Sequence, residues 1–421
     1  MRRSSSFCLA VVVILFLIAP QLHAFGDHGK RPKGHVMTPQ SSVPQPGEEG
    51  VKLRTHLKIF VPATGFLGKA VQPDELPPFP GLLFETPASL GCVYHLVRHP
   101  IPGCNPNLTT ENPSGGSGAI ALVEAFDDTT VASDLDAFSA QFGLPPADVT
   151  VVFAQGQPAP DTDGGFVLET ALDTQWAHAM APGAKLFVVE AADNTVANLL
   201  GATALASQLV AGSGGGEVSI SFGTGEFPEE TFLDPIFSTQ NVIYLASSGD
   251  GPGVQWPSAS PNVISAGGTT ISRDTDTGNF ILENTWQVGG GGASEVEPRP
   301  SFQNGIRRIV GGARGTPDIS FDADPITGVW VFNQNPVFGE GWFILGGTSL
   351  SSPALAGIIN AAGGGRASSQ AENAVLYSNI GQESVLRDIT YGNCGLSVSD
   401  FSQKGWDFCT GVGSPLGLRG K

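Results

Sequence analysis

The chain has 421 residues and a formal net charge of −18, from 39 acidic and 21 basic side chains. Because binding to nucleic acid or to anionic lipid needs a basic surface, this balance argues against both kinds of partner. Hydrophobic residues make up 41% of the chain, and 56 glycines and 32 prolines are present, which indicates a folded, loop-rich globular protein.

Residues 1–24 have the composition of a secretory signal peptide. Two arginines precede an apolar run from Cys8 to Ala19, and Ala24 ends a plausible cleavage site. The run is short for a membrane-spanning helix, so an uncleaved N-terminal anchor is the less favoured alternative. We expect a secreted protein, extracellular or periplasmic, that no membrane holds after cleavage.

Residues 25–117 are rich in proline and lack the regular pattern of the rest of the chain. Within 25–86 we expect a leader or short prosegment, ordered only in part, with one strand-like run from Leu57 to Val61. Residues 87–117 form a lead-in to the main domain that contains two of the cysteines.

Four cysteines remain once the signal peptide is removed, as two pairs that are local in the sequence: Cys92 with Cys104, and Cys394 with Cys409. Four cysteines allow three disulfide connectivities. Local pairing is the simplest of them, and an exported chain permits it. A zinc site is less expected, because no two cysteines have the CxxC spacing.

From Gly118 onward, short apolar runs alternate with segments of helical periodicity. Strands are predicted over 118–126, 149–153, 185–191, 218–222 and 242–247, and helices over 131–142, 166–180, 195–210 and 352–362. Alternating strands and helices predict a parallel sheet that is covered on both faces. We therefore expect one large α/β domain over 118–421, with its site at the carboxyl ends of the strands.

Ser349 follows a glycine pair and a threonine, and it precedes an alanine-rich helix. The start of a helix favours negative charge, so this serine could be a nucleophile, and a helix cap is the plainer alternative. A nucleophilic serine needs a base. The histidine within 118–421 is His178, which lies between two alanines in a predicted helix and is expected to be a packed structural residue. A Ser-His-Asp triad is therefore nearly excluded.

Glu169 and Asp173 lie four residues apart in the helix predicted over 166–180, which places both carboxyls on one face. An exposed acidic face is the plainer interpretation of such a pair. The rest of the helix is mostly apolar, however, and contains no basic neighbour. Two coupled carboxyls share a proton, which raises one pKa, so the pair can act as a base in acid, where histidine would be protonated.

Several motifs follow one another along the chain in a characteristic order: AIALVEAFDD, LETALDTQWAHAMAPGAKLFVVEA, VSISFG, YLASSGD, GGTSLSSP and KGWDFCTGVGSP. In sequence and order they resemble the sedolisin family, the serine-carboxyl peptidases, over about residues 118–421. The resemblance implies a subtilisin-like three-layer α/β/α fold with a mostly parallel central sheet. It also implies activity at acid pH on peptides or unfolded proteins, without a histidine base.

The resemblance assigns roles to four residues: Ser349 is the nucleophile, Glu169 the general base, Asp173 the acid that orients Glu169, and Asp250 the oxyanion-hole acid. A protonated carboxyl at Asp250 could donate a hydrogen bond to the oxyanion, although on its own this residue is typical of a turn. Residues 218–223 and 246–249 resemble the walls of the substrate cleft, where an extended peptide would add to the strand edges.

The C-terminal segment resembles the family's calcium loop and implies one structural Ca²⁺ ion. The implied ligands are the carboxylates of Asp388 and Asp407 and the backbone carbonyls of Ile389, Gln403 and Gly405. Hard oxygen donors of this kind suit calcium. The family usually has glycine where Gln403 stands, a change that a carbonyl ligand tolerates if the backbone does.

We expect a secreted, monomeric endopeptidase that acts on peptides or unfolded proteins through an acyl-enzyme on Ser349. A tripeptidyl exopeptidase or an acid esterase could use the same residues, and a non-catalytic binding protein on the same fold is the alternative from another class. Family members usually carry a large folded pro-domain, and residues 25–117 are too few and too rich in proline to form one. Control of latency is therefore the property that the resemblance leaves in doubt.

Overall fold

The computed structural model describes residues 33–63, 76–78, 82–363 and 365–421. The predicted signal peptide, residues 1–24, lies outside this part of the chain. Across the described ranges, no helix combines the length and the apolar character that crossing a bilayer requires.

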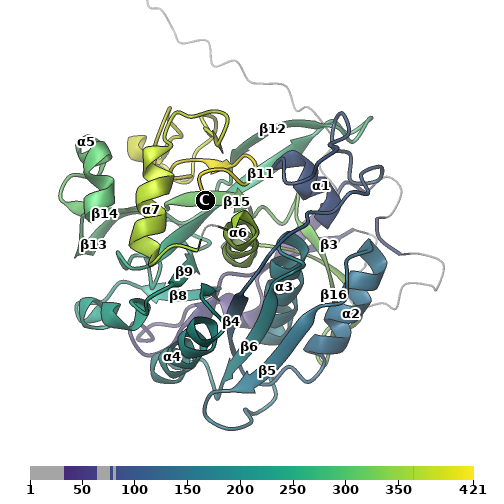
Figure 1. Cartoon of the computed structure of the whole chain (residues 1–421), viewed down its shortest axis with the longest axis horizontal. Helices are drawn as coiled ribbons and strands as arrows, with labels where there is room; N and C mark the ends of the chain where they lie inside the picture. Colours follow the sequence, from purple (N-terminus) through teal and green to yellow (C-terminus); the bar gives the residue numbers. More distant parts are fainter. Residues whose placement is uncertain (1–32, 64–75, 79–81, 364) are drawn as a thin grey trace, which may run out of the picture.

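An eight-stranded sheet forms the centre of the molecule (Figure 1). Its strands lie in the order β12 (Phe280–Thr285), β11 (Ile264–Arg273), β9 (Val242–Ser247), β7 (Gly216–Ile220), β4 (Ala119–Ala125), β6 (Lys185–Ala191) and β5 (Asp148–Phe153), and β15 (Ile319–Asp322) also pairs with β11. All of these pairs are parallel except β11 with β12. The mostly parallel central sheet that the sequence predicts is confirmed.

Helices cover both faces of this sheet, so the molecule has three layers. The covering helices are α2 (Val131–Phe142), α3 (Gly165–Met180) and α6 (Thr348–Ala362) on one face, and α4 (Val196–Gly212) on the other. Along β4, Ile120 and Leu122 belong to the first core, whereas Ala121 and Val123 belong to the second. Because successive side chains of a strand point to opposite faces, a strand buried on both sides is mostly apolar, as the sequence of β4 is apart from Glu124. The predicted α/β/α fold is confirmed.

Two boundaries near the site differ from the predicted ones. The run predicted as one strand over 218–222 is two strands, β7 and β8 (Phe222–Gly225), because β8 leaves the central sheet to pair with β10 (Gln255–Trp256). Helix α6 begins at Thr348 rather than at Ser352, so Ser349 lies within its first turn. Neither the split of the strand nor the earlier start of the helix changes the local pattern of apolar residues. The sequence pattern therefore could not show these two boundaries.

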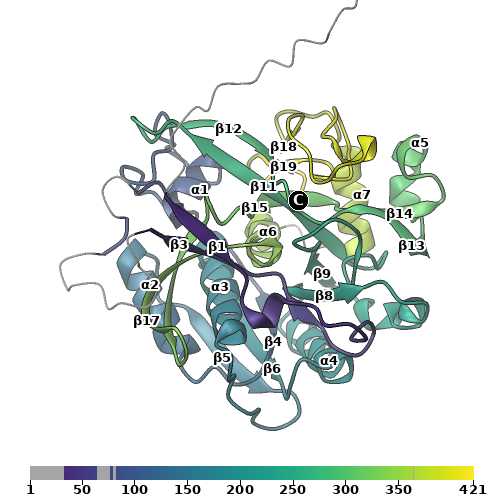
Figure 2. The same cartoon turned by 180° about the vertical axis from the view of Figure 1, so that it is seen from behind.

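Residues 33–63 cross one side of the molecule and take part in its core (Figure 2). They form β1 (Gly34–Met37), β2 (Arg54–Thr55) and β3 (Lys58–Pro62). β3 lies between β1 and β17 (Gly339–Gly346) in an antiparallel sheet that ends with β16 (Val329–Asn335). The strand-like run at 57–61 is thus confirmed as β3, and its Ile59 is fully buried. The division into a leader and a domain from 118 stays a prediction, although this segment shares a core with α3 and α6.

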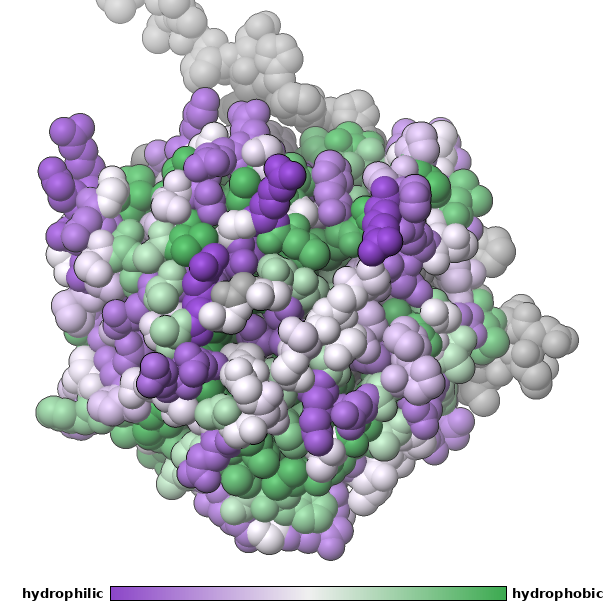
Figure 3. All heavy atoms as spheres, in the orientation of Figure 1, coloured by the Kyte–Doolittle hydropathy of each residue, from purple (hydrophilic) through white to green (hydrophobic). Residues whose placement is uncertain are grey.

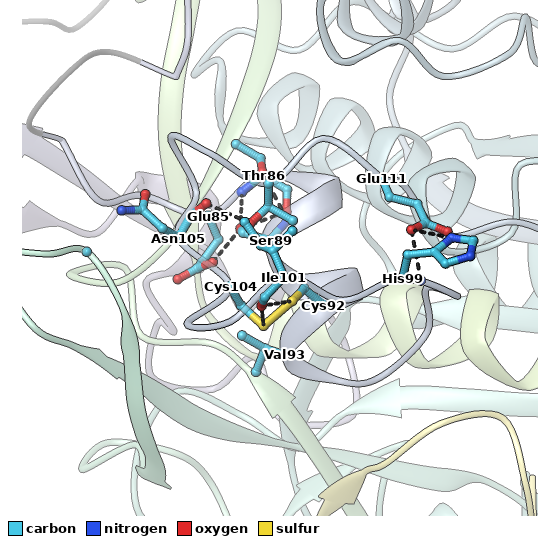
Figure 4. The surroundings of a disulfide bond; sticks show 12 residues. Glu85, Thr86, Ser89, Cys92, Val93, His99, Ile101, Cys104, Asn105 and Glu111 are labelled. Carbon is cyan, nitrogen blue, oxygen red and sulfur yellow. Dashed lines mark hydrogen bonds and ion pairs between the residues drawn. A yellow bond between two sulfur atoms is a disulfide. The ribbon is translucent and has the colours of Figure 1, made fainter.

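Both predicted disulfides, Cys92–Cys104 and Cys394–Cys409, are present. Figure 4 shows the first of them beside the short helix α1 (Pro87–Val93). The buried Glu85 carboxylate, just before this helix, pairs with Arg273 of β11 at 2.5 Å. The disulfide thus closes a loop within the lead-in segment, and the ion pair fastens the residue just before α1 to the central sheet.

The surface mixes residue types. On the face drawn in Figure 3, hydrophobic residues form separate small groups among hydrophilic ones. The large apolar clusters of the described chain lie instead inside the molecule, on the two sides of the central sheet.

Candidate active site

Ser349 lies where β17 passes into α6. The connection needs glycine at position 347, because its φ is +103° and an added Cβ would lie 2.0 Å from the backbone oxygen of His56 and 2.8 Å from Oδ2 of Asp250. Ser349 itself is fully buried, and the segment that contains His56 is in contact with it. The serine is thus held at the start of a helix, where backbone N–H groups have no helical partner and can bind an oxygen.

A proline in α6 changes the hydrogen bonding around Ser349. Pro353 has no N–H, so the carbonyl of Ser349, four residues earlier, receives no helical hydrogen bond. The hydroxyl of Ser221 lies 3.2 Å from that carbonyl and can take the place of the missing donor. The same hydroxyl lies 2.6 Å from Oδ2 of Asp173. Ser221, which was not among the predicted site residues, therefore connects the backbone of the serine to the acids of α3.

Glu169 and Asp173 lie on one side of α3, as their spacing predicts, and both are fully buried. Burial is the main cause that raises the pKa of each carboxyl well above its ordinary value. The charge of Asp173 raises the pKa of Glu169 further, and the Ser349 hydroxyl lowers it. That hydroxyl donates to the Ser221 carbonyl at 3.1 Å, so it acts on the Glu169 carboxyl without giving it a full hydrogen bond. A basic carboxylate beside a serine hydroxyl can take its proton.

A third carboxyl, that of Glu124, extends this pair, and it was not predicted. Glu124 lies on β4, is 1% exposed, and has its pKa raised by burial first and by the charges of Asp173 and Glu169 next. Its carboxyl interacts with that of Asp173, and Oδ1 of Asp173 and Oε1 of Glu124 have no other hydrogen-bond partner in the described ranges. One proton shared between these oxygens accounts for both facts. The signal in the sequence is a single acid in the otherwise apolar strand AIALVEA, because buried acids are rare without a partner.

Asp250 follows β9 at the carboxyl end of the central sheet, where the fold predicts functional groups. Its Oδ1 accepts hydrogen bonds from the backbone N–H and the hydroxyl of Thr348, at 2.8 and 3.0 Å. Its Oδ2 accepts none in the described part of the chain and lies 4.0 Å from Nζ of Lys58. Burial raises the pKa of Asp250 to about 6, against the opposing effect of Lys58. In mildly acid solution this carboxyl is therefore protonated, and its Oδ2 can act as a donor.

The backbone of His56 lies directly on Ser349. The carbonyl oxygen of His56 accepts a hydrogen bond from the Ser349 N–H at 3.1 Å, and the N–H of His56 donates to Oγ of Ser349 at 3.0 Å. The residues just before His56 form β2, which pairs antiparallel with β8. An extended segment of the chain thus lies along the predicted wall at 218–223 as a bound peptide would, with one carbonyl at the serine and near Oδ2 of Asp250.

No described histidine ring is bonded to the Ser349 hydroxyl. The ring of His56 lies 2.6 Å from Oγ of Ser247 through Nδ1, and burial lowers its pKa to about 3. The ring of His178, expected to be structural, bonds the carbonyl of Pro145 at 2.8 Å through Nε2. The groups next to the serine are therefore carboxyls. His56 was not predicted as a site residue, because residues 25–86 were assigned to a leader.

The candidate calcium ligands lie in two stretches of the chain, which hydrogen bonds from Gly405 to Asp388 bring together. Both oxygens of Asp388 accept from the N–H of Gly405, at 3.1 and 3.0 Å, and Oδ2 of Asp407 accepts from the N–H of Gln403 at 2.9 Å. No ion pair in the described ranges neutralises either carboxylate, and no backbone hydrogen bond there uses the carbonyls of Ile389, Gln403 or Gly405. The described residues contain no cluster of three or more His, Cys, Asp or Glu that could hold a metal. The donors therefore fit Ca²⁺ only if carbonyls and water complete the ligand set.

Comparison with known proteins gives the following likenesses. No family model matches the chain. The chain is 31% identical over 357 residues to kumamolisin from Bacillus sp. (strain MN-32), which covers 73% of this chain and 60% of that protein. It is 27% identical over 356 residues to tripeptidyl-peptidase 1 from Dictyostelium discoideum, and this match covers 74% of this chain and 55% of that protein. The chain thus spans less than two thirds of the length of these relatives.

One solved structure shares most of the fold. Pseudomonas sedolisin, a serine-carboxyl proteinase in complex with two molecules of pseudo-iodotyrostatin, matches with a TM-score of 0.64 and 24% identity. The match covers 79% of this chain and 95% of that one. At this level of identity the likeness shows a common architecture.

Proposed function

The chain belongs to the sedolisin family of serine-carboxyl peptidases, and we propose that it hydrolyses peptide bonds at acid pH with Ser349 as nucleophile and Glu169 as general base. The observation that carries this proposal is the carbonyl of His56, which accepts from the Ser349 N–H at 3.1 Å with the Asp250 carboxyl nearby. A peptide carbonyl held at a buried serine, with donors for the charge that develops on its oxygen, is what acyl transfer requires.

In the proposed reaction, Oγ of Ser349 forms a bond to the substrate carbonyl carbon while its proton moves to the Glu169 carboxylate. The Ser349 N–H and the protonated Asp250 carboxyl donate hydrogen bonds to the oxyanion. Glu169 then gives its proton to the leaving amine as the C–N bond breaks. Water then attacks the acyl-enzyme while Glu169 accepts its proton, and Glu169 returns that proton to Oγ of Ser349 as the ester bond breaks and the acid product leaves.

Two titrations with opposite requirements give a bell-shaped pH dependence. Asp250 must hold a proton to act as a donor, so its pKa of about 6 sets the alkaline limit. Glu169 must be ionised to accept a proton, so the protons that it shares with Asp173 set the acid limit. The proposed optimum therefore lies in the acid range.

The path of the N-terminal segment favours an endopeptidase. The chain continues on both sides of the His56 carbonyl, through β2 before it and β3 after it. More than three residues precede this carbonyl along the cleft, because the N–H of Leu53 bonds the carbonyl of Asn194 at 2.9 Å and Lys52 pairs with Thr195. An enzyme that removes tripeptides needs a barrier that closes the cleft beyond the third residue before the cut. In this protein the chain passes through that position at Leu53 and Lys52. The likeness to tripeptidyl-peptidase 1 keeps that activity as the second candidate.

We further propose that the protein is secreted, acts as a monomer on peptides or unfolded proteins, and binds one structural Ca²⁺ ion. Two disulfides fit an oxidising compartment. Asp388 and Asp407, with the carbonyls of Ile389, Gln403 and Gly405, would hold the ion, which would fasten the C-terminal loop. The ion has no part in the proposed reaction.

The test compares the wild-type chain with Ser349→Ala, Glu169→Gln and a control, Ser351→Ala. Ser351 is a buried serine of the same helix whose hydroxyl bonds the carbonyl of Phe321, so its loss perturbs packing without removing the proposed chemistry. Each protein is incubated between about pH 3 and 7 with a denatured protein, and its own mass is followed for a cut after His56.

We expect the wild type and the control to cleave, and the two site variants to lose about 10³-fold or more in rate. Cleavage by Ser349→Ala at the wild-type rate would refute the proposal. So would a wild-type chain that cleaves neither itself nor the added protein at any pH in this range.

A further inference from the structure

The segment in the cleft makes side-chain contacts of two kinds. Leu53 and His56 place their side chains in pockets of the surrounding domain, whereas Arg54 and Thr55 form their side-chain hydrogen bonds within residues 33–63. The backbone of Arg54 and Thr55 pairs with β8, which is a contact that any sequence can make. The pockets therefore indicate which positions of a substrate the cleft can discriminate.

Leu53, three residues before His56, packs its side chain into a pocket of the apolar core on the α4 side of the sheet. Its side chain is almost completely buried, with 1% of the residue exposed. Leu53 itself, with Leu199, Leu200, Thr203, Ile220, Phe222, Phe237, Trp256 and Pro257, lines the small space that remains there. Because this lining contains no charged residue, a charged side chain here would be buried without a partner. The pocket fits an aliphatic side chain of about the size of leucine.

The ring of His56 occupies a polar pocket beside Ser349. Nδ1 lies 2.6 Å from Oγ of Ser247, and the polar side chain of Gln255 lies close enough to act on the ring. Gly223 forms one wall, where an added Cβ would lie 2.9 Å from Cε1 of the ring. Burial lowers the pKa of the ring to about 3, and the nearby Lys58 lowers it further, so the ring is held without charge. The pocket offers hydrogen-bonding groups, and neither Ser247 nor Gln255 can neutralise a cation.

The two side chains between these positions turn to the segment's own residues. The guanidinium of Arg54 bonds both carboxylate oxygens of Glu48, at 2.9 and 2.5 Å. The hydroxyl of Thr55 bonds those of Ser41 and Ser42, at 2.9 and 2.7 Å. A separate peptide substrate lacks these partners, so these two positions provide an internal control for any selection by the pockets.

We propose that the cleft selects its substrates at two positions, cutting after an uncharged side chain that hydrogen-bonds Ser247, as His56 does, and requiring an aliphatic side chain three residues earlier, where Leu53 lies. Glutamine, asparagine and neutral histidine meet the first requirement. This inference rests on the proposed peptidase function and specifies its substrates.

The first experiment measures kcat/KM at about pH 5, where the free histidine side chain is still protonated, for the peptide Leu-Arg-Thr-Gln-Leu-Lys with neutral flanks, using the full chain incubated beforehand in acid. Glutamine stands in for histidine, because a free histidine is protonated at this pH. Replacing the first leucine by alanine removes three buried carbons, so we expect a loss of about 10- to 100-fold. Replacing the glutamine by arginine should cost at least about 10-fold. Replacing the arginine or the threonine of the peptide by alanine should change kcat/KM by less than about threefold.

Enzyme variants test the polar pocket itself. Ser247→Ala should reduce the preference for glutamine over alanine at the cleavage position by about 3- to 10-fold, the effect of one neutral hydrogen bond. Ser265→Ala, which removes another buried serine hydroxyl from a neighbouring strand, should leave the preference unchanged.

A second measurement does not require an added peptide to displace the chain's own segment from the cleft. The rate of the cut after His56 in the chain itself should fall in Leu53→Ala and stay near the wild-type rate in Arg54→Ala. Equal rates for all peptides and for both chain variants would overturn the selection while leaving the peptidase function intact. A wild-type chain that cuts neither the peptides, nor itself, nor a denatured protein would overturn both.

Discussion

The histidine that occupies the cleft should make this occupancy depend on pH. Burial and Lys58 lower the pKa of His56 from its ordinary value of 6.5 to about 3, while Gln255 acts weakly in the opposite direction. Only the neutral ring is therefore held. Above pH 6.5 the neutral ring makes its full contribution to the free energy with which the segment binds in the cleft. This contribution is lost progressively as the pH falls from about 6.5 towards about 3.

The size of the effect follows from the two pKa values. At pH 4 the released ring is protonated and the bound ring is not, over an interval of about two and a half pH units, which corresponds to about 3 kcal/mol. Acid should therefore weaken the binding of the segment by about two orders of magnitude. Asp250 and Glu169 titrate in the same cleft, so the effect of His56 must be separated from theirs.

The assay uses the Ser349→Ala background, in which no bond is cut, and a fluorescent peptide whose side chains do not titrate between pH 4 and 7. Its apparent Kd is measured at both pH values for His56 and for His56→Gln. We expect the peptide to gain about two orders of magnitude more affinity on acidification with histidine present than with glutamine. Because both proteins keep Asp250 and Glu169, their contribution cancels in this ratio. The same pH dependence in both proteins would refute the reasoning.

Three further predictions concern single residues. Gly347→Ala should lower kcat/KM by about two orders of magnitude or more, since the new Cβ would lie 2.0 Å from the His56 oxygen; full activity in this variant would contradict the geometry. Glu124→Ala should lower kcat about 10-fold or more with KM unchanged, whereas Glu124→Gln, which can still donate to Asp173, should keep most of the rate; equal loss in both would argue against a shared proton. Ca²⁺ should raise the Tm of the wild type and EDTA should lower it, and a calorimetric shift that persists in Asp388→Asn would rule out the proposed ligand set.

The central sheet and its helices could be predicted because their signals are local. Helix α2 has the predicted bounds, and the apolar strands follow from burial on both faces. The four residues with assigned roles also came from motifs, and the structure brings Ser349, Glu169 and Asp173 together on α6 and α3. Glu124 was visible as an acid in an apolar strand, but its partner could not be known, because β4 and α3 meet only in three dimensions.

The contact between the N-terminal segment and the site could not be predicted from local pattern. His56 and Ser349 lie 293 residues apart in the chain. Residues 25–86 contain many prolines, and their strands are short, so the composition indicates a loose leader. What orders residues 33–63 is the pairing of β2 with β8 and of β3 with β17, whose edges are supplied by distant parts of the chain. Such pairing depends on backbone groups that every residue has, and it leaves no mark on side-chain composition.

The sheet formed by β1, β3 and β17 has a kinetic consequence. It anchors the chain on both sides of the cleft segment, through β3 after it and through the pairing of β1 with β3 before it. A tethered segment competes for the cleft at an effective concentration on the order of millimolar, whatever the concentration of protein. An added peptide at micromolar concentration thus meets a competitor in large excess until the tether opens. Reaction progress curves should begin with a lag that does not shorten on dilution, and the apparent KM should fall once the lag is over.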